Sequence, residues 1–144
     1  MQMYLWGPKT QNFLSYNAPS DLVGRLPVVG VNSGFGPTIA TNPVTADVVL
    51  VSPIKGCTTL SNTNLTGKIA LIERGGCNFA VKFKNAQDKG ALGVIVYNVS
   101  DSPAVGNMGG TDTTVTIPGV LTENAEGELI KSKLSANTVV NANI

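Results

Sequence analysis

The feature that most constrains the fold is a pair of short apolar segments that flank one amphipathic segment in the middle of the chain. Residues 68–72 read Lys-Ile-Ala-Leu-Ile and residues 93–97 read Gly-Val-Ile-Val-Tyr, as expected of strands buried on both faces of a sheet. Between them, Phe79, Phe83 and Ala86 follow helical spacing and define one apolar face. The pattern predicts a βαβ unit, in which a right-handed helical crossover joins two parallel strands.

The ends of the predicted helix are marked as well. Asn78 is a favourable N-cap and Gly90 a natural residue just past the C-terminus. Other positions of this segment fall outside the predicted apolar face and are polar: Lys82, Lys84, Asp88 and Lys89.

Valine-rich runs bounded by Pro, Gly and Asn predict further strands within residues 26–31, 47–51, 115–121 and 138–144. A second helix is expected after Thr122, which can cap it; Ala125, Leu129, Ile130 and Leu134 repeat at helical spacing. Residues 1–20 read as irregular, but their scattered apolar side chains indicate that they pack on something. Residues 98–114 read as a long loop.

Composition narrows the possible functions. Charged residues make up 13% of the chain and the net charge is +1, against about 25% charged residues in an ordinary soluble domain. The chain has no cluster of basic residues, so nucleic acid and anionic membranes are unsuitable partners. No apolar run is long enough to span a bilayer. A polar but uncharged surface of Asn, Thr, Ser and Gly is typical of a secreted protein.

The sequence offers few of the residue patterns on which enzyme catalysis depends. The chain contains no histidine, which excludes the Ser-His-Asp triad, the Cys-His dyad and His-based zinc sites. Its nine carboxylates are dispersed, and those at the start of the second predicted helix, Glu123, Glu126 and Glu128, suit the helix dipole and solubility. We therefore expect no catalytic residue, no metal and no cofactor.

Two polar segments have alternative interpretations. Asp101, Asn107 and Asp112 share a loop and could offer oxygen ligands to calcium, but their spacing is not that of an EF-hand and an ordinary polar loop is favoured. Residues 74–76, Arg-Gly-Gly, lead into the predicted helix, where free amides can bind anions. No P-loop pattern is present, so the choice lies between a tight turn and a contact with a peptide carboxylate or carbonyl.

The two cysteines, Cys57 and Cys77, are compatible with one disulfide, which would close a loop of about 20 residues. Two cysteines alone establish little. Asn64 and Asn98 each begin a glycosylation sequon.

The central motif resembles that of the protease-associated (PA) domain. The matching stretches are residues 67–79 (Gly-Lys-Ile-Ala-Leu-Ile-Glu-Arg-Gly-Gly-Cys-Asn-Phe), Lys82, residues 85–87 (Asn-Ala-Gln), residues 90–98, residues 108–110 (Met-Gly-Gly) and residues 116–120 (Thr-Ile-Pro-Gly-Val). The resemblance covers about residues 26–136. It implies an α/β fold with a mixed, open sandwich- or barrel-like sheet, a central βαβ unit and flanking helices. On this basis we expect a PA domain over residues 26–144, with residues 1–25 as an extension that packs on the domain or on its host.

The resemblance also implies a function. PA domains are non-catalytic parts of secreted or lumenal proteins, such as subtilisin-like proteases, zinc aminopeptidases and fungalysin-type metallopeptidases. The Phe35-Gly36-Pro37 stretch, followed by a strand and Cys57, looks most like secreted bacterial metallopeptidases. Cys57 stands where many members carry the disulfide partner of Cys77, so we expect that bond.

The expected role is to contact protein or peptide substrate, or to cover the active site of a secreted host peptidase. The alternatives are a structural insert that orients neighbouring domains, and a cargo-binding lumenal domain like that of a sorting receptor. In sorting receptors the equivalent of Arg74, Gly75, Gly76, Cys77 and Phe79 borders the cargo site.

The two loops that follow the paired strands, residues 74–78 and 98–114, should open on the same edge of the sheet, where ligands of open α/β sheets gather. We therefore predict a partner-binding surface formed by Arg74, Gly75, Gly76, Asn98 and Met108.

Overall fold

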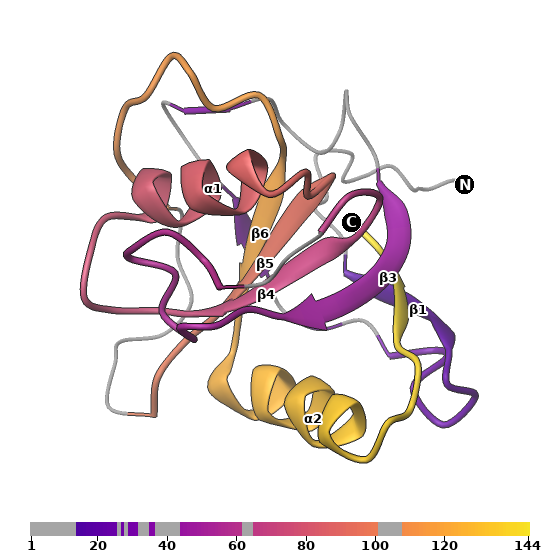
Figure 1. Ribbon diagram of the computed structural model, residues 1–144. Coiled ribbons are helices and arrows are strands. Elements are labelled where there is room, and N and C mark those ends of the chain that lie inside the picture. Colours follow the sequence, from indigo (N-terminus) through magenta and orange to yellow (C-terminus); the bar gives the residue numbers. More distant parts are fainter. Residues whose placement is uncertain are drawn as a thin grey trace, which may run out of the picture.

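The computed structural model describes residues 14–25, 27, 29–31, 35–36, 44–61, 65–100 and 108–144. These residues form one mixed sheet with a helix on each face (Figure 1). In chain order the elements are β1 (Ser15–Ala18), β2 (Val29–Val31), β3 (Thr45–Leu50), β4 (Ile69–Glu73), α1 (Phe79–Asp88), β5 (Gly93–Tyr97), β6 (Gly119–Thr122), α2 (Asn124–Ser135) and β7 (Asn141–Asn143).

The sheet has the order β1-β7-β3-β4-β5-β6-β2. Its centre is parallel, because β3, β4, β5 and β6 pair in that orientation. The outer strands pair antiparallel: β2 with β6, β7 with β3, and β1 with β7. The sheet curls across its width (Figure 1). The predicted α/β class, with a mixed barrel-like sheet and a central βαβ unit, is confirmed.

The core has two halves because the central strands are buried on both faces. In β4, Ala70 and Ile72 point to the side of α1, where they join a cluster with Phe83. Ile69 and Leu71 point to the other side and join a cluster with Ile130 of α2. Side chains alternate between the two faces along a strand, so an unbroken apolar run packs against α1 on one face and against α2 on the other.

The N-terminal region contains more regular structure than the sequence indicated. Residues 15–18, expected to be irregular, form β1 and pair with β7 near the other end of the chain. Leu14, Tyr16 and Leu22 are buried in the cluster under α2. Residues 1–13 lie outside the described residues, and the boundary proposed at residue 26 stays a prediction.

Three details of the helices differ from expectation. Thr122 ends β6, and Glu123 occupies the N-cap position of α2. Ala125 is exposed, whereas the neighbouring Glu126 is buried. Asn78 does occupy the N-cap of α1, but its side chain makes no capping hydrogen bond. Neither the Thr122 cap nor the Asn78 side-chain cap is therefore formed.

Within the described residues, neither helix has the length and apolar character needed to cross a membrane.

Candidate functional site

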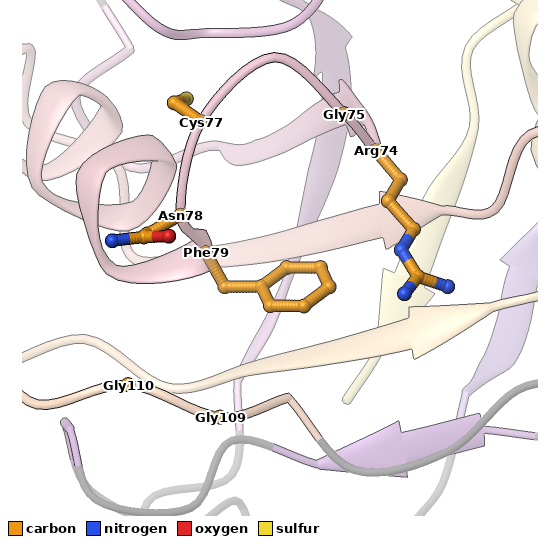
Figure 2. Close-up of a pocket in the computed structure, with 7 residues that line it drawn as sticks. All are labelled: Arg74, Gly75, Cys77, Asn78, Phe79, Gly109 and Gly110. Atoms are coloured by element: carbon orange, nitrogen blue, oxygen red, sulfur yellow. The ribbon is translucent and has the colours of Figure 1, made fainter.

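A pocket of about 400 Å³ opens where the loop after β4 meets the segment that precedes β6. We call it the Arg74 pocket. It is lined by Arg74, Gly75, Cys77, Asn78, Phe79, Gly109 and Gly110. Figure 2 shows the guanidinium group of Arg74 and the ring of Phe79 projecting into the same space beside Gly109 and Gly110. The two loops that follow β4 and β5 thus meet at one edge of the sheet.

Two glycines form the turn at this pocket: Gly75 lines it, whereas the predicted contact residue Gly76 does not. Gly75 and Gly76 have φ values of 111° and 82°, which other residues rarely adopt. A Cβ atom on Gly76 would also lie 3.1 Å from the Cys57 sulfur atom. The turn is therefore tight, because the side chains of Lys55 and Cys57 occupy the space that side chains at these two positions would need.

A disulfide joins Cys57 to Cys77, with 5.7 Å between their Cα atoms. It connects the loop after β3 to the residue that precedes the N-cap of α1, and Cys77 itself lines the Arg74 pocket. The bond restrains the wall of the pocket on the side of α1.

The disulfide leads to a first expected result. The intact mass of unreduced, purified protein should be lower than that of the reduced chain by the two thiol hydrogens. Reduction should lower the free energy of unfolding by about 3 kcal/mol, because a closed loop of this length restricts the unfolded chain. Two thiols that alkylate freely without a reductant would contradict the bond.

Arg74 is held by local contacts and still reaches the pocket. Its Nη1 donates a hydrogen bond to Asn98 Oδ1 at 2.9 Å. Its guanidinium carbon lies 5.5 Å from the centre of the Phe79 ring, within the range of a cation–π contact. Its backbone amide donates to the Tyr97 carbonyl oxygen at 2.9 Å. Arg74 thus both braces its own turn and presents a guanidinium group to the pocket.

The remaining predicted contact residues are buried. Asn98 is 4% exposed and lies beside Arg74 as its hydrogen-bond acceptor. Met108 is fully buried among the core residues packed under α1, including Phe83. Their side chains support the pocket from within, so the soft surface contact expected of Met108 is not present. Burial also makes Asn98 a poor acceptor for a glycan.

The alternative polar sites receive little support. Asp112 Oδ1 accepts hydrogen bonds from the amide and the hydroxyl of Thr114, which lower the pKa of Asp112. Its contacts are those of an ordinary polar turn. Asp101, Asn107 and the sequon residue Asn64 lie outside the described residues. Within the described part of the chain, no cluster of three or more His, Cys, Asp or Glu side chains could hold a metal ion.

Lys82, beside this site, differs from its predicted position. The sequence pattern placed it outside the apolar face of α1, but its side chain is fully buried. Its Nζ donates to the carbonyl oxygens of Lys55, Glu73 and Gly75 at 2.6, 2.9 and 2.6 Å and lies 3.8 Å from the Cys57 sulfur atom. A sequence signal was available, because Lys82 lies three residues after Phe79 and four before Ala86, on the side that faces the core.

The charges behind the pocket form a small network. Lys55 Nζ lies 2.8 Å from Glu73 Oε2, and this hydrogen bond is the main cause that lowers the pKa of Glu73. The pKa of Lys82 is lowered to about 8, mainly by burial and also by the nearby charge of Lys55, while the charge of Glu73 opposes the shift. At neutral pH Lys82 is therefore mostly an ammonium group.

Comparisons with known proteins find matches over most of the chain. The sequence model of the PA domain matches residues 44–130, more than half of the chain. "Receptor homology region, transmembrane domain- and RING domain-containing protein 1" of Oryza sativa subsp. japonica is 34% identical over 113 residues, which is 76% of this chain and 21% of that protein. "Signal peptide peptidase-like 2" of Arabidopsis thaliana is 30% identical over 121 residues, or 81% of this chain and 22% of that protein.

Among solved structures, the aminopeptidase from Aneurinibacillus sp. strain AM-1 aligns with a TM-score of 0.67 and 29% identity. The alignment covers 91% of this chain and 31% of the aminopeptidase chain. The chain thus spans about a fifth to a third of the length of these similar proteins.

Proposed function

This chain belongs to the PA-domain family, and on that premise we propose that it is a non-catalytic accessory domain of a secreted peptidase. It contacts protein or peptide substrate through the Arg74 pocket, or covers the host's active site from that edge of the sheet. The observation that carries the proposal is the pocket itself, where a guanidinium group, an aromatic ring and bare glycine backbone meet.

The lining suits a peptide better than a small metabolite. A guanidinium group offers a planar set of donors that fits a carboxylate or a carbonyl oxygen, and the Phe79 ring offers apolar contact beside it. The glycines on both sides, Gly75 and Gly109 among them, leave room for an extended main chain. No cofactor is needed for this role.

A peptidase host is supported by the likeness to the Aneurinibacillus aminopeptidase, in which the aligned region is about a third of the chain. The partners are then the neighbouring domains of the host and its protein substrates. We place the domain outside the cell, in keeping with its disulfide. A subtilisin-like or fungalysin-type host is the specific form of this proposal.

A second candidate rests on the plant relatives. The name of the rice protein contains a receptor homology region and a transmembrane domain, so a cargo-binding lumenal domain in a receptor-like protein would use the same pocket. A purely structural insert would instead leave the pocket empty. Peptide binding by the isolated domain would distinguish the peptidase and cargo-binding roles from that of a structural insert. The other domains encoded by the same gene would distinguish the peptidase role from the cargo-binding role.

The test is a titration of the isotope-labelled domain with unstructured peptides that represent host substrates, followed by amide chemical shifts. Shifts should concentrate at Arg74, Gly75, Phe79, Gly109 and Gly110, and the peptides should be recovered uncleaved. Arg74→Ala should weaken binding by roughly tenfold to a hundredfold, because a hydrogen bond to a charged group contributes about 1.5–3 kcal/mol. Its melting temperature should fall by only a few degrees, since a half-exposed side chain is lost.

Lys68→Ala is the matched control, because it removes one positive charge just before the start of β4, at the opposite edge of the sheet from Arg74. It should bind peptides as the wild type does. The proposal fails if Arg74→Ala binds as well as Lys68→Ala, or if the wild type shows no localised shifts. A large drop in the melting temperature of Arg74→Ala with unchanged peptide binding would show that Arg74 only stabilises its own turn.

A further inference from the structure

The group that holds the wall of the Arg74 pocket in shape is a buried amine. Lys82 lies in α1, and its Nζ reaches two segments that are separate in sequence. One is the loop after β3, at Lys55, and the other runs from the end of β4 at Glu73 into the glycine turn at Gly75. An ammonium group has three donors, and all three are used.

Burying the Lys82 ammonium group costs free energy, so other contacts must offset that cost. Among the ion pairs of the described residues, none involves Lys82, and the Glu73 carboxylate is bonded to Lys55 instead. A buried charge without a counter-charge is unfavourable unless polar groups surround it. Here the polar groups are backbone carbonyls, which would lose a hydrogen-bond donor if an apolar side chain replaced the lysine.

The turn that these bonds hold is a weak element without them. Gly75 and Gly76 are adjacent, and glycine loses more conformational freedom on folding than any other residue. Lys82 bonds directly to the carbonyl oxygen of Gly75, a residue that lines the pocket. The disulfide fixes the far end of the turn at Cys77, which leaves the segment from Arg74 to Gly76 dependent on other contacts.

We propose that Lys82 is the positioning residue of the Arg74 pocket: its three amine hydrogen bonds order the glycine turn before a partner arrives. Lys82 itself does not line the pocket and acts through the turn. A preordered turn loses less entropy on binding and so binds more tightly. The effect on affinity rests on the proposed function, whereas the ordering of the turn does not.

The test compares Lys82→Met with Lys84→Met, an exposed position of the same helix that pairs with Asp88. In Lys82→Met, backbone order parameters at Gly75 and Gly76 should fall from about 0.85 to below about 0.6, with β4 and β5 unchanged. Peptide affinity should drop roughly tenfold while Arg74 is intact. Lys84→Met should match the wild type in both measurements.

Chemical rescue distinguishes hydrogen bonding by the amine from the effect of its positive charge alone. Lys82→Ala removes three carbons and the amine, which is the n-propylammonium ion. Adding n-propylammonium should restore the order parameters of the turn, whereas tetramethylammonium, a cation without N–H donors, should not. Equal rescue by both ions would show that charge alone is required and would overturn the proposal.

If neither variant folds, the wild type still provides the test. The ¹³Cε resonance of Lys82 should titrate near pH 8, and the amide resonances of Gly75 and Gly76 should shift with the same midpoint. Lys55→Met should raise that midpoint, and Glu73→Gln should lower it, since their charges act on Lys82 in opposite directions. A midpoint near 10.5 with no response in the turn would overturn the proposal.

The outcomes for the pocket and for Lys82 are separable. If no peptide binds the wild type but Lys82→Met disorders the turn, the proposed function fails and the positioning role stands. If peptides bind and Lys82→Met leaves both the turn and the affinity unchanged, the disulfide alone is sufficient and the positioning role fails.

Discussion

Replacing Gly127 by alanine should lower the free energy of unfolding by about 3 kcal/mol. Gly127 lies in α2 at the point where the helix crosses β5. A Cβ atom there would lie 2.0 Å from Cγ and 2.1 Å from Cβ of Tyr97, whose side chain is fully buried. Neither the helix backbone nor the ring can yield without disturbing the core, and this cost exceeds the gain of about 1 kcal/mol from alanine's higher helix propensity.

Urea denaturation followed by circular dichroism measures this change. Gly109→Ala is the control for the added methyl group, because no atom of the described residues lies within 4 Å of the position that its Cβ would take. Its stability should stay within about 0.5 kcal/mol of the wild type. A Gly127→Ala protein as stable as Gly109→Ala would show that α2 does not pack on Tyr97 as described.

A second large effect is expected at Glu126, which with Lys82 is one of the two buried charged side chains among the described residues. Its side chain accepts hydrogen bonds from the Tyr16 hydroxyl at 2.6 Å and from two nitrogens of Arg25. Glu126→Ala leaves the buried Tyr16 hydroxyl without this acceptor and breaks an ion pair in which the carboxylate is buried and the guanidinium group is half-exposed. We expect a loss of about 3 kcal/mol, mainly because the Tyr16 hydroxyl stays buried without an acceptor. The half-exposed Arg25 can rehydrate and adds little to the loss.

The pH dependence of this loss has a definite sign. Burial alone would raise the pKa of Glu126, but the hydrogen bonds from Arg25 and Tyr16 outweigh it and the pKa lies below its ordinary value. A carboxyl with a depressed native pKa stabilises the fold fully above its unfolded pKa, and this contribution is lost as the pH falls through the native pKa. The difference between wild type and Glu126→Ala should therefore be largest near neutral pH and shrink in acid.

Glu128→Ala is the matched control on the same helix, because Glu128 is half-exposed and its one ion pair within the described residues is with Lys131. It should cost no more than about 0.5 kcal/mol. A double-mutant cycle with Tyr16→Phe isolates the hydrogen bond from Tyr16. Equal stability of Glu126→Ala and Glu128→Ala, or a difference that does not change with pH, would contradict the buried pair.

Much of the architecture was predictable from the sequence because its determinants are local. The apolar runs that became β4 and β5 and the helical spacing of Phe79, Phe83 and Ala86 report burial within a single element. The glycines after Arg74 report a turn that only glycine adopts easily. Parallel pairing of the two strands then follows from the chirality of the crossover. These signals also indicated where the Arg74 pocket would open.

The tertiary structure alone decided which polar side chains the fold buries. Lys82 meets carbonyls 7, 9 and 27 residues away, and Glu126 meets Tyr16 and Arg25 at separations of 110 and 101 residues. β1 likewise forms only because β7, from the opposite end of the chain, offers its edge. Periodicity reports how apolar a face is, but a charged group becomes stable inside a protein only where distant segments bring hydrogen-bond partners to it. The sequence therefore determined the βαβ framework and the edge that carries the pocket, and the meeting of distant backbone segments determined the buried contacts that hold that edge in place.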